Sequence, residues 1–132
     1  MSQKIRALNA ATTPTKVDTP YGERILELVG RTVEPRTISH SFAEVVLPPG
    51  KASRRHLHPE AEETYYILKG TAYVELGAEA GHLSVGDAVV IPADTAHKIY
   101  NHGQEDLLFL VACAPAWEPG NTVWLEPLAE QD

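Results

Sequence analysis

The chain has 132 residues, and its 11 Lys and Arg stand against 18 Asp and Glu, which gives a formal net charge of -7. This length indicates a single domain with one core, and the acidic balance argues against nucleic acid or an anionic membrane as partner, because both require a basic surface. No apolar run is long enough for a transmembrane helix, no secretory signal is visible, and the lone Cys113 cannot form an internal disulfide, so we expect a cytoplasmic protein.

Short apolar runs separated by Gly, Pro and Asp follow a polar N-terminal segment. Residues 1–20 are polar and irregular and predict an N-terminal arm. Residues 23–29 fit either a helix or a strand, but Gly22 and Gly30 bound them so tightly that we favour a strand. Further strands are predicted, in chain order, at residues 41–47, 64–69, 71–76, 82–85, 88–91, 97–101 and 106–113.

The spacing of these runs predicts the fold class. Several short strands at intervals of about 8–12 residues indicate a β-sandwich or barrel, and no segment combines helical periodicity with caps. We expect an all-β fold, a closed or two-sheet jelly roll, formed by one domain over residues 21–132. The run at 106–113 is continuously apolar, which is typical of a strand covered on both faces.

Three histidines and a glutamate form the most informative pattern. His56 and His58 are one residue apart, so on a strand their side chains project to the same face. A short turn after Pro59 would let Glu63 return on the neighbouring strand, and a later stretch supplies His97. Three imidazoles and one carboxylate suit a divalent transition metal, with Mn, Fe, Ni and Zn all left open. Four protein ligands on an octahedral ion would leave two positions for water, oxygen or substrate.

These residues belong to two spaced motifs. The motif positions are Gly50, His56, His58, Glu63 and Gly70 for the first, and Gly86, Pro92, His97 and Asn101 for the second. Their order and spacing resemble the two motifs of the cupin superfamily, and the resemblance spans about residues 40–114. The departure is Asp94, where the family usually has Gly, and Asp tolerates a left-handed turn better than most residues. The resemblance implies a double-stranded β-helix, or jelly-roll barrel, with the three His and Glu63 as metal ligands inside it.

Two other carboxylates compete with Glu63 for the role of ligand. Glu60 and Glu62 lie in the same acidic turn, and Glu62 also satisfies the looser family spacing of three residues after His58. Only Glu63 keeps six residues to Gly70, so we favour it and interpret the other two as solvated.

Strand parity suggests which side chains surround the metal. If His56 and His58 point inward, Arg54 also points inward and can bind a carboxylate or phosphate, unless the strand begins after it and the arginine is solvated. Tyr65 shares the inward face of Glu63 and is either a hydrogen-bond donor or general base toward substrate, or a packed barrel residue. We assign Arg54 and Tyr65 as candidate catalytic residues.

Two tryptophans follow the last predicted strand. Trp117 and Trp124 would either cover the barrel mouth or be buried in a subunit interface, and we favour the interface. Small proteins of the family commonly dimerise by exchanging N-terminal strands, so the resemblance implies a homodimer.

The resemblance also bounds the function. It implies a metal-dependent enzyme, of isomerase or epimerase, lyase or oxygenase type, that acts on an oxygen-rich anionic small molecule with the metal as Lewis acid. The alternative is a non-catalytic barrel that binds a sugar or other metabolite. The chain has no room for a DNA-binding domain beside the barrel, which disfavours a transcription factor.

Overall fold

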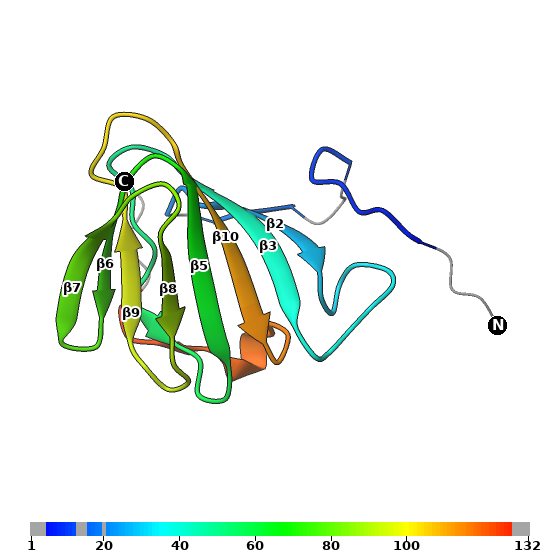
Figure 1. The fold of residues 1–132 in the computed structure, drawn as a ribbon. Coiled ribbons are helices and arrows are strands. Elements are labelled where there is room, and N and C mark those ends of the chain that lie inside the picture. The colour runs from blue at the N-terminus through cyan, green and yellow to red at the C-terminus, as the bar shows by residue number, and fades with distance from the viewer. Residues whose placement is uncertain (1–4, 13–15, 20, 128–132) are drawn as a thin grey trace.

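Two antiparallel β-sheets packed face to face make up the barrel in the computed structural model, which describes residues 5–12, 16–19 and 21–127 (Figure 1). One sheet has six strands in the order β1-β2-β3-β10-β5-β8, and the other has five in the order β11-β4-β9-β6-β7. The strands are β1 (Lys16–Asp18), β2 (Arg24–Val29), β3 (Ser41–Leu47), β4 (His56–Leu57), β5 (Glu62–Lys69), β6 (Ala72–Leu76), β7 (Glu79–Leu83), β8 (Ala88–Ile91), β9 (His97–Tyr100), β10 (Leu107–Ala114) and β11 (Val123–Trp124). This architecture confirms the predicted all-β jelly roll.

Alternating side chains of the two sheets fill part of the barrel interior with a hydrophobic core. In the six-stranded sheet, Leu47, Ile67 and Leu107 point inward and are fully buried. They pack with Val74 and Ile99 of the facing sheet in the hydrophobic core. Burying such aliphatic side chains contributes about 1.5–3 kcal/mol each, so this core provides much of the stability of the barrel. The cavity described below adjoins this core, because Val45, Ile99 and Phe109 belong to both.

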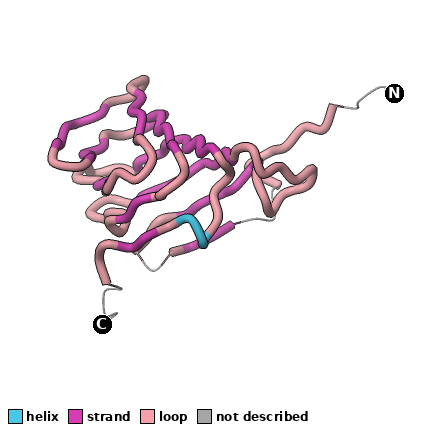
Figure 2. Tube along the Cα trace, turned by 90° about the horizontal axis from the view of Figure 1, so that it is seen from below, coloured by secondary structure: helices cyan, strands magenta, loops and turns pink. Residues whose placement is uncertain are grey.

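Three short elements in the terminal parts of the chain were not predicted from the sequence. Strand β1 lies within the predicted N-terminal arm and pairs with β2, while residues 5–12 extend away from the barrel (Figure 1). Strand β11 and the 3-10 turn at Pro119–Asn121 pass beneath the barrel, and β11 pairs with β4 (Figure 2). The two Cα pairs between β11 and β4, Val123 with Leu57 and Trp124 with His56, bring the C-terminal segment beside the predicted metal ligands.

Strand β7 is displaced from its predicted position. It begins at Glu79 rather than His82, because Gly77 takes a positive φ of 59° and turns the chain directly back onto β6. Within the described part of the chain, no helix is long and apolar enough to cross a membrane.

Candidate metal centre

Four side chains from three strands and one loop meet inside the barrel. His56 lies on β4, Glu63 on β5 and His97 on β9, and His58 follows β4 directly. One ligand atom from each lies within 4.8 Å of the others, and all but His56 are fully buried. The pairing of His56 with His97 across β4 and β9 sets the position of these two rings. The four residues singled out as ligands in the sequence are therefore brought together, whereas Glu60 and Glu62 are exposed.

Backbone contacts select one tautomer for all three imidazoles. The Nδ1 atoms of His56, His58 and His97 lie 2.7, 2.9 and 2.9 Å from the carbonyl oxygens of Arg54, Asn121 and Thr95 respectively. A carbonyl oxygen only accepts, so each Nδ1 carries the hydrogen and donates it. Each Nε2 is then left with a lone pair, as in the histidines that bind metals in other proteins.

The cluster fits a divalent cation because its buried atoms are all acceptors. Glu63 Oε1 lies 3.1 Å from Nε2 of both His58 and His97. Glu63 Oε1 and His97 Nε2 are buried and have no hydrogen-bond partner among the described residues. Two acceptors at this distance repel each other unless a proton or a cation lies between them. Nitrogen and carboxylate ligands in this number suit a first-row transition metal.

Burial and the neighbouring charges shift the pKa values within the cluster. Burial, reinforced by the charge of His97, lowers the pKa of His56 to about 4, which keeps this ring neutral. Burial opposes ionisation of Glu63, but its contacts with His58 and His97 outweigh burial and lower its pKa to about 2. The same contact with Glu63 outweighs burial at His58 and raises the pKa of that ring. The site therefore favours a carboxylate balanced by positive charge.

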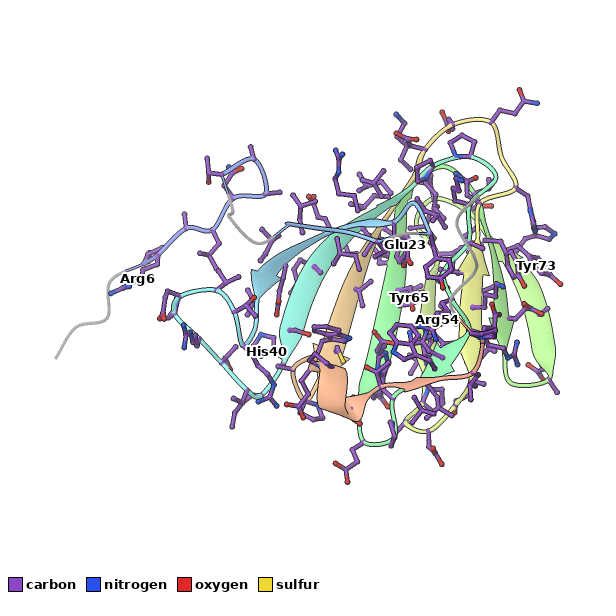
Figure 3. The ribbon with its side chains drawn as sticks, turned by 180° about the vertical axis from the view of Figure 1, so that it is seen from behind. Arg6, Glu23, His40, Arg54, Tyr65 and Tyr73 are labelled. Carbon is purple, nitrogen blue, oxygen red and sulfur yellow. The ribbon has the colours of Figure 1, made fainter. Side chains whose placement is uncertain are left out.

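A cavity of about 290 Å³ lies beside the cluster, and Arg54 forms part of its wall. The Arg54 Nε donates a hydrogen bond of 2.6 Å to the carbonyl of Glu126, and its guanidinium lies 4.5 Å from the centre of the Trp124 ring. Arg55, the next residue, faces outward and pairs with Glu75 at 3.9 Å. Strand β4 begins at His56, so neither arginine lies on a strand, but Arg54 lines the cavity and Arg55 faces outward. The catalytic role of Arg54 stays a prediction. Figure 3 shows Arg54 and Tyr65 together between the two sheets.

Tyr65 also lines the cavity, but its pKa is shifted in the direction opposite to the one that a general base requires. Burial, reinforced by the charges of Glu63 and Glu23, raises the pKa of Tyr65 well above its usual value. The hydroxyl therefore keeps its proton, which supports a donor role rather than that of a general base. Its ring packs against Phe109 at 5.1 Å and His97 at 6.0 Å between ring centres.

The structure adds cavity residues that the sequence did not single out. Glu23, at the start of β2, lines the cavity and lies near Tyr65 (Figure 3). Burial raises the pKa of this carboxyl to about 7. Strand parity with Ile25 could have found it, but residues 23–29 alone do not reveal which strand they pair with. Trp117 and Trp124, which the sequence did single out, line the cavity and are 40% and 49% exposed, while their burial in an interface stays a prediction.

Comparisons with known proteins agree with this architecture. The family model described as "Cupin domain" matches residues 43–113. An uncharacterised protein of Methanocaldococcus jannaschii is 34% identical over 82% of this chain and 86% of its own length. The oxalate-binding protein of Thermotoga maritima is 35% identical over 52% of this chain and 57% of its own length. The crystal structure of Lactobacillus farciminis oxalate decarboxylase in its formate complex has a TM-score of 0.73 and 26% identity, over 84% of this chain and 33% of that one.

Proposed function

Because the chain belongs to the cupin family, we propose that it is a metal-dependent enzyme that acts on an oxygen-rich anionic small molecule. The observation that carries this proposal is the cluster of His56, His58, Glu63 and His97, in which the buried Glu63 Oε1 and His97 Nε2 have no hydrogen-bond partner among the described residues. The similarity to oxalate decarboxylase supports the proposal, because a barrel of this fold forms part of that enzyme. The reaction type, whether isomerisation, elimination or oxygenation, follows from the assays below.

The residues around the cluster have separate roles in this proposal. A bound divalent metal supplies a Lewis acid for an oxygen atom of the substrate. Arg54 binds the anionic group of the substrate through the two terminal nitrogens that its contact with Glu126 leaves available. Tyr65 donates a hydrogen bond from its protonated hydroxyl to a second substrate oxygen. The apolar wall excludes water, which strengthens each of these contacts.

Metal uptake and turnover test the proposal together. The protein is loaded with Mn, Fe, Ni or Zn, its metal content is measured by elemental analysis, and sugar phosphates, hydroxy acids, keto acids and oxalate are assayed for isomerisation, elimination and oxygen uptake. We expect about one metal per chain and turnover with at least one substrate class. His58→Ala should lose the metal and keep its far-ultraviolet circular dichroism, while His82→Ala, at an exposed position on β7, should keep both. Equal metal content in the two variants would contradict the assigned ligands.

A second candidate is a binding protein without catalysis. The similarity to the oxalate-binding protein of Thermotoga maritima favours this alternative. Saturable binding of an anion to the metal-loaded protein, without turnover under any of the assay conditions, would establish it in place of the enzyme.

A further inference from the structure

The cavity wall is mainly apolar beyond the metal cluster. Ile25, Val45, Phe109 and Val111 line it from the six-stranded sheet, and Ile99 and Trp124 line it from the facing sheet. A substrate covered with hydroxyl groups would have to bury them against carbon atoms. Each buried hydroxyl without a partner weakens binding by about tenfold or more. The apolar character of the wall therefore disfavours anions that carry many hydroxyl groups.

The two serine hydroxyls that line the cavity are already engaged. Ser53 Oγ accepts the backbone N–H of Ile99 at 3.0 Å. Ser41 Oγ accepts the backbone N–H of Trp117, also at 3.0 Å. Both serines are buried, so their side chains hold strands and loops together rather than offering free partners to a polyol.

The metal cluster and Arg54 are the groups of the cavity that can bind an anion, and Trp124 lies beside both, with its ring 5.2 Å from that of His56 and 4.5 Å from the guanidinium of Arg54. The Tyr65 hydroxyl and the carboxyl of Glu23 also line the cavity, and Glu23 Oε1 accepts a hydrogen bond from the Thr19 hydroxyl at 3.4 Å. Arg54 stacks on Trp124, so its charged group adjoins an apolar ring surface. Such a site recognises a charged head group and covers an uncharged carbon body in contact with it.

We infer that the ligand of this cavity is a small carboxylic acid with an apolar aliphatic or aromatic body, rather than a sugar acid or a bare dicarboxylate. The carboxylate lies between the cluster and Arg54, and the carbon body lies against Val111, Phe109 and Trp124. This inference rests on the proposed function for the metal and the anionic head group, and it revises the rest of the substrate from an oxygen-rich body to an apolar one.

A series of 2-hydroxy acids tests the inference with a single head group. Lactate, 2-hydroxybutanoate, 2-hydroxyhexanoate and gluconate are titrated by calorimetry into the metal-loaded protein and into the metal-free protein at one pH. Affinity should increase roughly fourfold for each added methylene until the cavity is full. Gluconate has the same carbon number as 2-hydroxyhexanoate, and it should bind at least about tenfold more weakly because its extra hydroxyls find no partners.

Two pairs of variants separate the head group from the wall. Arg54→Met should weaken all the acids by a similar factor, whereas Arg55→Met, at the outward-facing neighbour, should leave them unchanged. Val111→Thr adds a hydroxyl to the wall at nearly constant volume, so it should reduce the increase of affinity with the chain length of the acid. The control Val46→Thr, on the outer face of β3, should leave this increase unchanged.

The outcomes distinguish this inference from the proposed function. Tighter binding of gluconate, a sugar phosphate or oxalate than of 2-hydroxyhexanoate would overturn the inference and leave the proposed function in place. Increasing affinity with chain length in a protein that takes up no metal would support the inference and contradict the proposed function. Binding of none of these acids to protein with measured metal content would contradict both.

Discussion

At the residue scale, we expect the stability of the protein to depend on pH because Glu23 is buried in the cavity wall. Burial raises the pKa of this carboxyl from 4.5 to about 7. Between these values the unfolded chain loses the proton that the folded chain keeps, so the unfolding free energy decreases as pH rises from about 4.5 to about 7. Glu23→Gln removes this loss, and the variant should exceed the parent by on the order of 2 kcal/mol at pH 8 but not at pH 4.

Urea unfolding at the two pH values measures this difference. Glu105→Gln, at an exposed loop position, is the control and should match the parent at both. A gain in Glu23→Gln that is equal at pH 4 and pH 8 would show that the carboxyl is not held protonated by its surroundings.

Asn101 is a buried residue whose three side-chain hydrogen bonds predict a large loss of stability on substitution. Its side chain is 1% exposed, its Nδ2 donates to the carbonyls of Leu47 and Glu105 at 2.8 Å each, and its Oδ1 accepts the N–H of Gly103 at 2.9 Å. Asn101→Ala leaves these three backbone groups without partners and should cost about 3 kcal/mol or more. The unfolding free energy from urea titration checks this value. Metal content per folded chain should stay unchanged, because the residue lies in a loop beyond the cluster.

The same scale shows what sequence spacing can and cannot predict of the site. Parity along β5 gives Tyr65 the same inward face as Glu63, whereas Arg54 and Arg55 precede β4 and take opposite orientations through their contacts with Glu126 and Glu75. The pKa of Tyr65 depends on how completely the barrel encloses its side chain, and the spacing of residues in the sequence does not predict this enclosure. Glu23 was missed because its role depends on a pairing between β2 and β3 that no local pattern in residues 23–29 specifies.

At the element scale, the turn before β9 joins backbone conformation to ligand position. Asp94 has a φ of 60°, and its N–H donates to the carbonyl of His58 at 2.8 Å. Asp94→Gly should therefore change the unfolding free energy by less than about 1 kcal/mol, whereas Asp94→Val should cost about 1–2 kcal/mol because a β-branched residue resists this conformation.

The two variants also separate the turn from the metal centre. Because the turn supports His58, we expect Asp94→Val to reduce metal affinity and Asp94→Gly to retain it, as measured by competition with a chelator. Equal stability and equal affinity of the two variants would show that the positive φ carries no cost.

Elements with strong local signals were predicted from the sequence, and elements formed by pairing alone were not. The strands β3 and β8 match their predicted bounds because apolar runs and turn residues delimit them. In β7, the segment Glu79–Leu83 carries little strand preference and is extended because β6 lies beside it. Strands β4 and β11 have two residues each, and only their contact with each other and with β9 defines them.

At the scale of the whole molecule, the outer faces of the two sheets differ in character. The outer face of the five-stranded sheet carries charged side chains such as Glu75 and Lys98, together with Tyr73, which is labelled in Figure 3. The outer face of the six-stranded sheet carries mainly apolar ones, listed from its exposed and half-buried positions as Phe42, Val46, Tyr66, Leu68, Val90, Leu108 and Leu110. The apolar run of β10 was expected to be covered on both faces, yet this chain covers only its inner face.

The homodimer that the family resemblance implies stays a prediction, and from this asymmetry we predict that its contact would lie on the six-stranded sheet. Tyr66, Leu68 and Val90 are 41%, 39% and 52% exposed, and a contiguous apolar face of this kind usually marks an interface. Tyr66→Glu puts a charge at its centre beside Leu110 and should weaken association by at least about tenfold, since a buried unpaired charge is costly. Tyr73→Glu makes the same change on the outer face of the other sheet and should leave the dimer intact. Sedimentation equilibrium of the three proteins measures the dissociation constants, and a monomeric parent, or equal constants for the two variants, would contradict this interface.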